Sequence, residues 1–302
     1  MTVATRLAAF ALLLGLAFGG AALAGAAIDA PRQHETPQGG HDGHGRSGTG
    51  DHGETGVTAM DTEHGHDGTA ADGVAVSEGG YTLEPERRFV SLGQPARFAF
   101  RILDARGDAV RDGYQLESDR ELHLIVVRRD LRGYQHLHPA RDSSGTWSTE
   151  LNVPEAGVYR VYADFEVRGE HHTLATDVFV RGDFQPRPLP AAELRARADG
   201  YQVALRTTGV RAGSDSALTF DVTQDGRPVA ELQSYLGTKG HLVALREGDL
   251  AYLHVHPDEA KLNPSEIRFM AAFPSAGRYR LFLQFRAAGR VHTVAYTLEV
   301  PR

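Results

Sequence analysis

Histidines recur in this chain at one fixed spacing, and imidazole is the commonest protein ligand for zinc and copper ions. The stretch HLIVVRRDLRGYQHLHP holds His123, His136 and His138, and the stretch HLVALREGDLAYLHVHP holds His241, His254 and His256. A fourth histidine follows at a matching place, as His172 in the first copy and His292 in the second. The pattern predicts one divalent-metal site in each copy, built from that copy's own histidines.

The elements that must position these residues are hairpins. In the first copy two runs with strand character flank the polar turn 129–133, and the simplest register sets His123 opposite His138. That register places His136 two residues away on the same face. Cross-strand neighbours have Cβ atoms about 4.5–5.5 Å apart, so three imidazoles can reach one ion. A slip of one residue would send His123 to the other face of the sheet.

The same face also carries apolar side chains, which supports two other interpretations. Ile125, Val127 and Tyr134 accompany the first set of histidines. The first alternative is that this is a core face whose histidines bond to carbonyls, in a structural or adhesive envelope protein without metal. A three-histidine zinc site that activates water for hydrolysis is a second alternative. No phosphate loop, nucleophile elbow or HExxH motif is present, and we expect a protein that is not an enzyme.

The histidines belong to a repeat that predicts an all-β fold. Gly80-Tyr81 opens the first copy and Gly200-Tyr201 opens the second. Within each copy, apolar and polar residues alternate in short runs separated by Gly and Asp turns. We expect two tandem immunoglobulin-like antiparallel β-sandwiches, at residues 80–182 and 200–302, joined by the Pro-rich linker 183–199. Outside the N-terminal segment, a helix is conceivable only around residues 191–197.

Composition limits the classes of partner. The chain has 302 residues, a net charge of −7 and no cysteine, which excludes thiolate metal sites and thiol redox chemistry. Residues 25–80 hold ten acidic residues against two arginines, whereas acids and bases balance from Tyr81 onward. A chain of this charge offers no basic surface for nucleic acid.

The N-terminal region indicates export. Residues 1–24 resemble a secretory signal peptide, with an uncleaved membrane anchor as the alternative. Residues 25–79 contain almost no large apolar side chains and are predicted to form a disordered tether. Closely spaced His and Asp residues give this tether a weak metal-binding capacity of its own, through His41, His44, His52, His64 and His66.

The two histidine hairpins resemble those of secreted bacterial proteins with paired Ig-like domains. The turn that begins at Asp104 (Asp-x-x-Gly-x-x-Val) also looks like turns of extracytoplasmic copper-associated β-sandwiches of the CopC and YtkA kind. A CopC-type site would need a histidine at the mature N-terminus, where this chain has Gly25-Ala26-Ala27, so no ligand is transferred from that resemblance.

Together these observations predict a secreted protein that binds Cu(II) or Zn(II) for sequestration or for delivery to an envelope acceptor protein. Membrane contact is expected only if the N-terminal segment stays uncleaved. Because bound imidazoles must be neutral, affinity is expected to fall as the pH drops through about 6.5.

Overall fold

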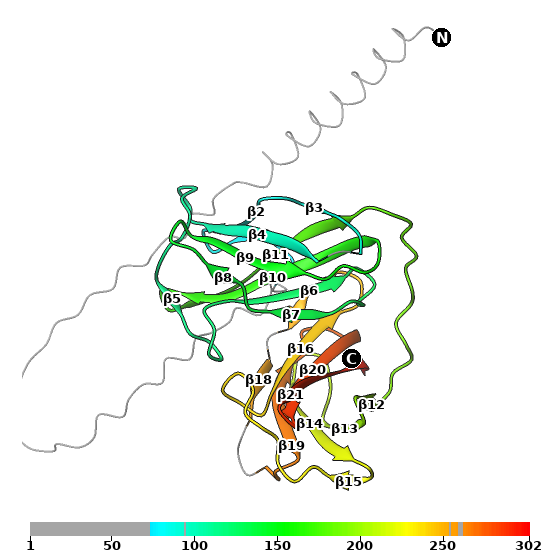
Figure 1. The fold of residues 1–302 in the computed structure, drawn as a ribbon. Helices are drawn as coiled ribbons and strands as arrows, with labels where there is room; N and C mark the ends of the chain where they lie inside the picture. Colours follow the sequence, from blue (N-terminus) through cyan, green and yellow to red (C-terminus); the bar gives the residue numbers. More distant parts are fainter. Residues whose placement is uncertain (1–72, 94, 254, 259–261) are drawn as a thin grey trace, which may run out of the picture. The chain divides into compact units, whose positions relative to one another are not determined.

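The structure, a computed structural model, describes residues 73–93, 95–253, 255–258 and 262–302, and in these ranges every regular element is a β-strand. The strands form four sheets, two for each copy of the repeat (Figure 1). No helix long and apolar enough to cross a membrane occurs among the described residues. The predicted signal peptide and all of the predicted tether up to residue 72 lie outside the described residues.

The first copy forms a two-sheet sandwich. One sheet has the order β1-β2-β4-β9-β8, and the other has the order β3-β11-β10-β6-β7 with β5 also paired to β10. The strands are β1 (Ser77–Glu78), β2 (Tyr81–Pro85), β3 (Phe89–Val90), β4 (Ala96–Leu103), β5 (Tyr114–Gln115), β6 (His123–Arg128), β7 (Gln135–Leu137), β8 (Ala140–Arg141), β9 (Thr146–Leu151), β10 (Gly157–Val167) and β11 (Glu170–Val180).

The second copy repeats this arrangement. Its sheets have the orders β12-β13-β14-β19-β18, with β15 paired to β14, and β17-β16-β20-β21. The strands are β12 (Arg195–Ala198), β13 (Tyr201–Thr208), β14 (Asp215–Gln224), β15 (Arg227–Pro228), β16 (Gly240–Arg246), β17 (Tyr252–Leu253), β18 (Val255–Pro257), β19 (Glu266–Ala272), β20 (Gly277–Ala287) and β21 (Arg290–Val300).

The strand order in both copies is that of an immunoglobulin-like sandwich, with one A-B-E-D sheet facing one G-F-C-C′ sheet. A second mark of that fold is the tyrosine corner. Tyr159 Oη donates to Glu155 O at 2.8 Å, and Tyr279 Oη donates to Ser275 O at 2.9 Å. The predicted fold, two tandem Ig-like β-sandwiches, is confirmed.

Each sandwich has its own apolar core, because one face of each strand alternates inward. In β4, Phe98, Phe100 and Ile102 point into the first core and are at most 2% exposed. Leu218, Phe220 and Val222 on β14 occupy the corresponding positions in the second core. The alternation seen in the sequence is therefore the alternation between core and surface.

A third apolar cluster explains why β6 is buried on both faces. Leu124 and Val126 belong to the first core, whereas Ile125 and Val127 pack in a cluster with side chains of the second sandwich. Two aromatic pairs lie in that cluster: Tyr134 stacks on Phe282 with ring centroids 4.2 Å apart, and Tyr162 lies 5.5 Å from Tyr252. The sheet that contains β6 and the sheet that contains β16 therefore pack on each other, each with the face that points away from its own core. The histidines lie on these two faces.

The hairpin registers agree with the sequence prediction up to a point. Ile125 pairs with His136, which is the register that sets His123 opposite His138. In the second copy Ala244 pairs with Leu253, as expected for His241 opposite His256. The chain then leaves that sheet, and β18 pairs with β19 in the other one. The helix considered around residues 191–197 is absent, since β12 is a strand paired with β13.

Candidate metal centre

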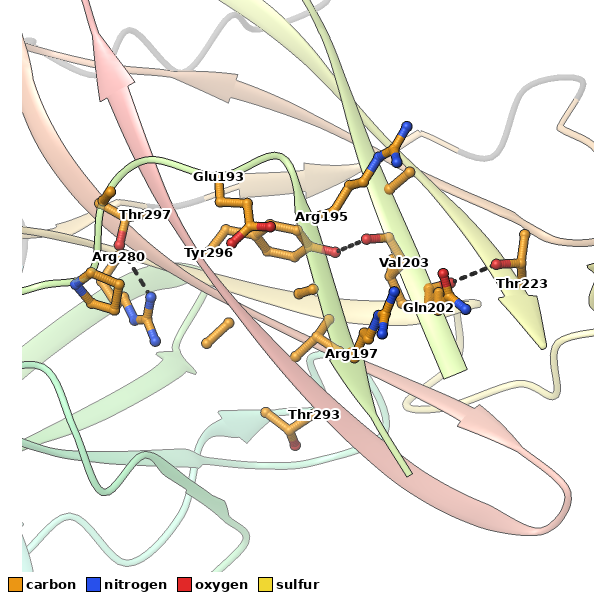
Figure 2. Close-up of a pocket in the computed structure, with 16 residues that line it drawn as sticks. Glu193, Arg195, Arg197, Gln202, Val203, Thr223, Arg280, Thr293, Tyr296 and Thr297 are labelled. Carbon is orange, nitrogen blue, oxygen red and sulfur yellow. Dashed lines mark hydrogen bonds between the residues drawn. The ribbon is translucent and has the colours of Figure 1, made fainter. Parts of the chain in front are cut away.

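Two concave regions bear on the search for a site. A groove of about 870 Å³ lies along β12 and β21, and no histidine lines it (Figure 2). A much smaller cavity of about 60 Å³ is lined by His123, His241 and His256 together with two carboxylates. Of these two regions, the smaller cavity is therefore the one lined by histidines of the predicted sets.

His123 is the first residue of β6, and it pairs with Asp164 on the neighbouring strand β10. The side chain is 2% exposed. Its Nε2 lies 2.9 Å from the main-chain oxygen of Glu117. A carbonyl oxygen can only accept, so Nε2 carries the ring hydrogen and Nδ1 carries a lone pair.

His136 is carried by β7 and lies beside His123. Its Nδ1 is 2.7 Å from Gln284 Oε1, which comes from β20 of the second sandwich. Gln284 is oriented by its own contacts, because its Nε2 donates to Thr293 Oγ1 at 3.2 Å and its Oε1 accepts from Tyr235 Oη at 3.3 Å. Nδ1 of His136 therefore carries the hydrogen, and Nε2 carries the lone pair.

The remaining two nitrogens face each other. His123 Nδ1 and His136 Nε2 are 2.8 Å apart, and each carries a lone pair when its ring is neutral. Two lone pairs at that distance need a shared proton or a cation between them. The other nitrogen of each ring donates to a protein oxygen, which is the arrangement that orients metal-binding histidines in known centres.

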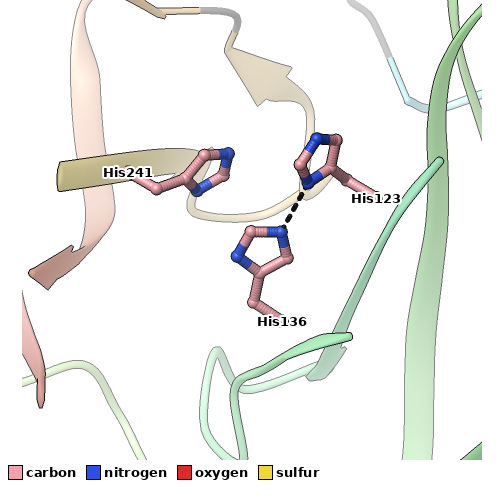
Figure 3. Close-up of side chains that lie close together, drawn as sticks. All are labelled: His123, His136 and His241. Carbon is pink, nitrogen blue, oxygen red and sulfur yellow. Dashed lines mark hydrogen bonds between the residues drawn. The ribbon is translucent and has the colours of Figure 1, made fainter. Parts of the chain in front are cut away.

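His241 brings a third imidazole from the second sandwich. One nitrogen from each of His123, His136 and His241 lies within 4.8 Å of the other two, and the three rings converge in Figure 3. The His241 ring lies 4.2 Å from the His136 ring, centroid to centroid. Nitrogens bound to one tetrahedral zinc at about 2.0–2.1 Å lie about 3.4 Å apart, so small rotations of these rings would bring them into ligand positions.

His138 lies at the edge of this cluster. Its ring centroid is 4.7 Å from that of His136 and 5.1 Å from that of His123. Its Nε2 is buried and has no hydrogen-bond partner among the described residues. A buried imidazole nitrogen without a partner costs free energy, and an ion held by the neighbouring rings would remove that cost.

The electrostatics of the cluster disfavour a proton as the bridge. Burial, followed by the nearby rings of His241, His123 and His138, holds the pKa of His136 well below its ordinary value. Burial also lowers the pKa of His138 to about 4, with smaller contributions from His123 and Arg120. These two rings are therefore neutral near pH 7, which is the form that binds metal ions.

Acidic groups line the cavity next to the rings. Glu117 and Asp164 both contribute to it, and His171 Nε2 lies 2.9 Å from Asp164 Oδ1 and 3.5 Å from Glu117 Oε2. Burial, followed by the charge of Asp164, raises the pKa of Glu117. These carboxylates place negative charge beside the cluster and favour a bound cation.

The other predicted ligands are not part of this group. His172 packs on Tyr81 and Phe165, and His292 packs on Tyr201 and Phe285. His256 is exposed on β18 and lines the small cavity, but its nitrogens are not grouped with those of His123, His136 and His241. His254 and the tether histidines His41, His44, His52, His64 and His66 lie outside the described residues.

The structure thus groups the histidines differently from the prediction of one site in each copy. Three histidines of the first copy lie beside one histidine of the second, since the two hairpin faces pack on each other. Sequence reasoning missed Glu117 and Gln284 as the acceptors that orient the rings. The available signal was Gln284 itself, a polar residue in a strand that is otherwise rich in apolar residues, at the place where the first copy has Asp164.

A family model described as "Domain of unknown function (DUF8832)" matches the chain twice, at residues 75–182 and 196–302. No curated protein matches the chain.

The solved structures that match the chain include a Salmonella alpha-2-macroglobulin, with 14% identity over 76% of this chain and 15% of that one, and a TM-score of 0.27. The Escherichia coli adhesin FdeC shares 12% identity over 76% of this chain and 66% of its own, with a TM-score of 0.24. The Yersinia pseudotuberculosis adhesin InvE shares 10% identity over 73% and 59%, with a TM-score of 0.22. These values assign no function to the chain, and the resemblance to CopC and YtkA gains no support from them.

Proposed function

We propose, for a chain that belongs to the family DUF8832 and carries its domain twice, that the two copies together hold one divalent metal ion. The ion is bound by His123, His136 and His241, with His138 as a fourth ligand. The observation that carries the proposal is the pair of ring nitrogens 2.8 Å apart whose partner nitrogens both donate to protein oxygens.

The ligand set favours copper or zinc. Imidazoles suit Cu(II), Zn(II) and Ni(II), whereas soft Cu(I) prefers thiolate and thioether ligands. The chain has no cysteine, and Met270 is the only methionine after residue 60. Copper stands above zinc in the Irving–Williams order, so Cu(II) binds most tightly in vitro. The biological role that follows is extracytoplasmic sequestration or delivery of copper or zinc.

The test is metal titration of the full chain with Co(II), Zn(II) and Cu(II), with competition against a chelator of known affinity. Tetrahedral Co(II) bound by imidazoles gives intense visible absorption, which weak octahedral binding by a His/Asp-rich tether does not give. We expect one strongly absorbing Co(II) per chain, and its loss in His136→Asn and in His241→Asn. His172→Gln is the matched control, because His172 is a domain histidine outside the cluster.

Equal Co(II) spectra for the wild type and both cluster variants would overturn the proposal. Binding that disappears only when the five tether histidines are replaced would assign metal capture to the tether and leave the sandwiches as scaffolds.

A second candidate function is a structural or adhesive module without metal. It is favoured by the contacts that His123 and His136 already make to each other, to Glu117 and to Gln284, and by the apolar cluster that joins the sandwiches. In that case the rings share a proton and hold the two sandwiches together. Purified protein that stays free of metal after exposure to Cu(II) or Zn(II) and desalting would support this candidate.

A further inference from the structure

The two copies differ at the edge of one sheet, and the difference leaves a groove on the second sandwich. In the first sandwich, the segment before β1 reaches across to β11. Gly73 N donates to Thr173 O at 3.1 Å, and Ala175 N donates to Ala75 O at 2.8 Å. Residues 73–75 therefore add a short extended stretch to the edge of β11.

In the second sandwich the corresponding stretch stays with the opposite sheet. Ala196 in β12 pairs with Val203 in β13, and β21 receives a main-chain bond only further along, from Glu193 N to Thr297 O at 3.3 Å. Ala295 occupies the place of Ala175. At the edge of β21 that faces away from β20, its main-chain N–H has no partner among the described residues. The groove of about 870 Å³ between β12 and β21 occupies this place.

Each copy has an arginine at this place, and the two arginines differ in the acceptors around them. Arg160 on β10 donates to Gly73 O at 3.2 Å and to Val74 O at 2.5 Å, and it lies 3.3 Å from Asp177 Oδ1. Main-chain oxygens and a carboxylate thus surround this guanidinium in the first copy.

Arg280 is the counterpart of Arg160, but its surroundings differ. Thr297 stands where the first copy has Asp177, and Arg280 donates to its Oγ1 at 3.1 Å. The Nε atoms of Arg280 and Arg160 are both buried without an acceptor among the described residues, so the two arginines differ in the main-chain oxygens and the carboxylate that only Arg160 contacts. A partly buried guanidinium without a carboxylate is costly, and it attracts an anionic group.

The walls of the groove add to this charge. Arg195 and Arg197 line it together with Arg280, against the single acidic residue Glu193, and Figure 2 shows Arg280 and Thr297 at one end of the group. The lining of the groove therefore carries more positive than negative charge, with three arginines against one glutamate.

We propose that this groove binds an extended peptide of a partner protein, which pairs with the open edge of β21 and sets an Asp or Glu carboxylate against Arg280. Main-chain bonds to a sheet edge supply affinity in this mode of recognition, and side-chain pockets supply selectivity. The first sandwich shows the geometry, since residues 73–75 already occupy the equivalent place there. The proposal is independent of metal binding.

The test uses the full chain and a fluorescein-labelled heptapeptide of alternating valine and aspartate, measured by fluorescence anisotropy. The comparison peptides carry asparagine in place of aspartate, or N-methyl groups on alternate main-chain amides. We expect the aspartate peptide to bind at least tenfold more tightly than either comparison peptide. Arg280→Gln should reduce its affinity to that of the asparagine peptide.

Two further variants keep the test decisive. Thr297→Asp gives Arg280 the carboxylate that Arg160 has, so it should also weaken binding of the aspartate peptide at least tenfold while preserving the fold. Arg160→Gln is the matched control and should leave peptide affinity unchanged. Unchanged affinity in both Arg280→Gln and Thr297→Asp would overturn the proposal. Equal binding of the N-methylated peptide, with displacement by inorganic phosphate, would also overturn it and indicate a small-anion site.

Discussion

At the scale of single residues, the candidate site depends on the groups behind the rings as much as on the rings. Glu117 O and Gln284 Oε1 fix which nitrogen of His123 and of His136 carries the hydrogen. The spacing of the histidines was readable from the sequence. These acceptors were not, because Glu117 contributes a main-chain oxygen, which no side-chain pattern reports, and Gln284 belongs to the other sandwich.

The role of Gln284 gives a prediction about metal affinity. Gln284→Leu removes the acceptor of His136 Nδ1–H, and loss of such an acceptor lowers metal affinity about 10- to 100-fold. Gln284→Glu is the matched control, since it keeps an acceptor oxygen, and we expect it to retain or increase affinity. Competition with a chelator measures both, and equal affinity in the Leu variant would contradict the orienting role.

The lowered pKa values of His136 and His138 predict how the stability of the metal-free protein depends on pH. Both rings titrate near pH 6.5 when unfolded, and below that pH the unfolded chain binds more protons than the folded one. Stability should therefore be constant above pH 6.5 and fall between pH 6.5 and about 4, the folded pKa of His138. Allowing for solvent screening, we expect a loss on the order of 2 kcal/mol.

Urea unfolding of the metal-free chain from pH 7.5 to 4.5 measures this loss, with the double variant His136→Asn, His138→Asn as the control. A pH dependence that is the same in the variant would refute the assignment. The lowered pKa values also move proton competition for metal below the pH of about 6.5 expected from sequence alone.

At the scale of elements, alternation and turn residues predicted the strands, the repeat and the register of the first hairpin. Departures arise where the choice of pairing partner decides. β18 pairs with β19 instead of continuing the hairpin with β16, and β12 forms a strand because it pairs with β13. The strand propensity of such short segments depends on the neighbours they pack against, so the local pattern does not decide the pairing.

The tyrosine corner allows a paired prediction for the first sandwich. Tyr159→Phe removes the bond to Glu155 O and should lower the free energy of unfolding by about 1 kcal/mol. Tyr134 Oη is buried with no hydrogen-bond partner among the described residues, so Tyr134→Phe should be neutral or stabilising. Chemical denaturation measures the free energy of unfolding of both variants. Equal losses would contradict the prediction that only the Tyr159 hydroxyl stabilises the fold.

At the scale of the whole described unit, residues of both sandwiches form one apolar cluster and one group of histidines. A ligand that binds only the native state stabilises it by about 2.7 kcal/mol at a free concentration of 100 times its Kd. Because the proposed ligands come from both sandwiches, Zn(II) should raise the unfolding temperature of both together.

Differential scanning calorimetry tests this, with and without Zn(II). We expect a single, higher transition in the wild type and no shift in His241→Asn. A shift confined to one of two resolved transitions would mean that the ligands all belong to one sandwich.

The pairing of His123 and His136 with His241 also affects biosynthesis. A chain is synthesised from its N-terminus, so the first two of these residues emerge long before the third. A nascent or truncated product that ends within the first sandwich lacks His241, the third histidine of the proposed site. The proposed site is therefore complete only after the second sandwich has been made and has packed on the first.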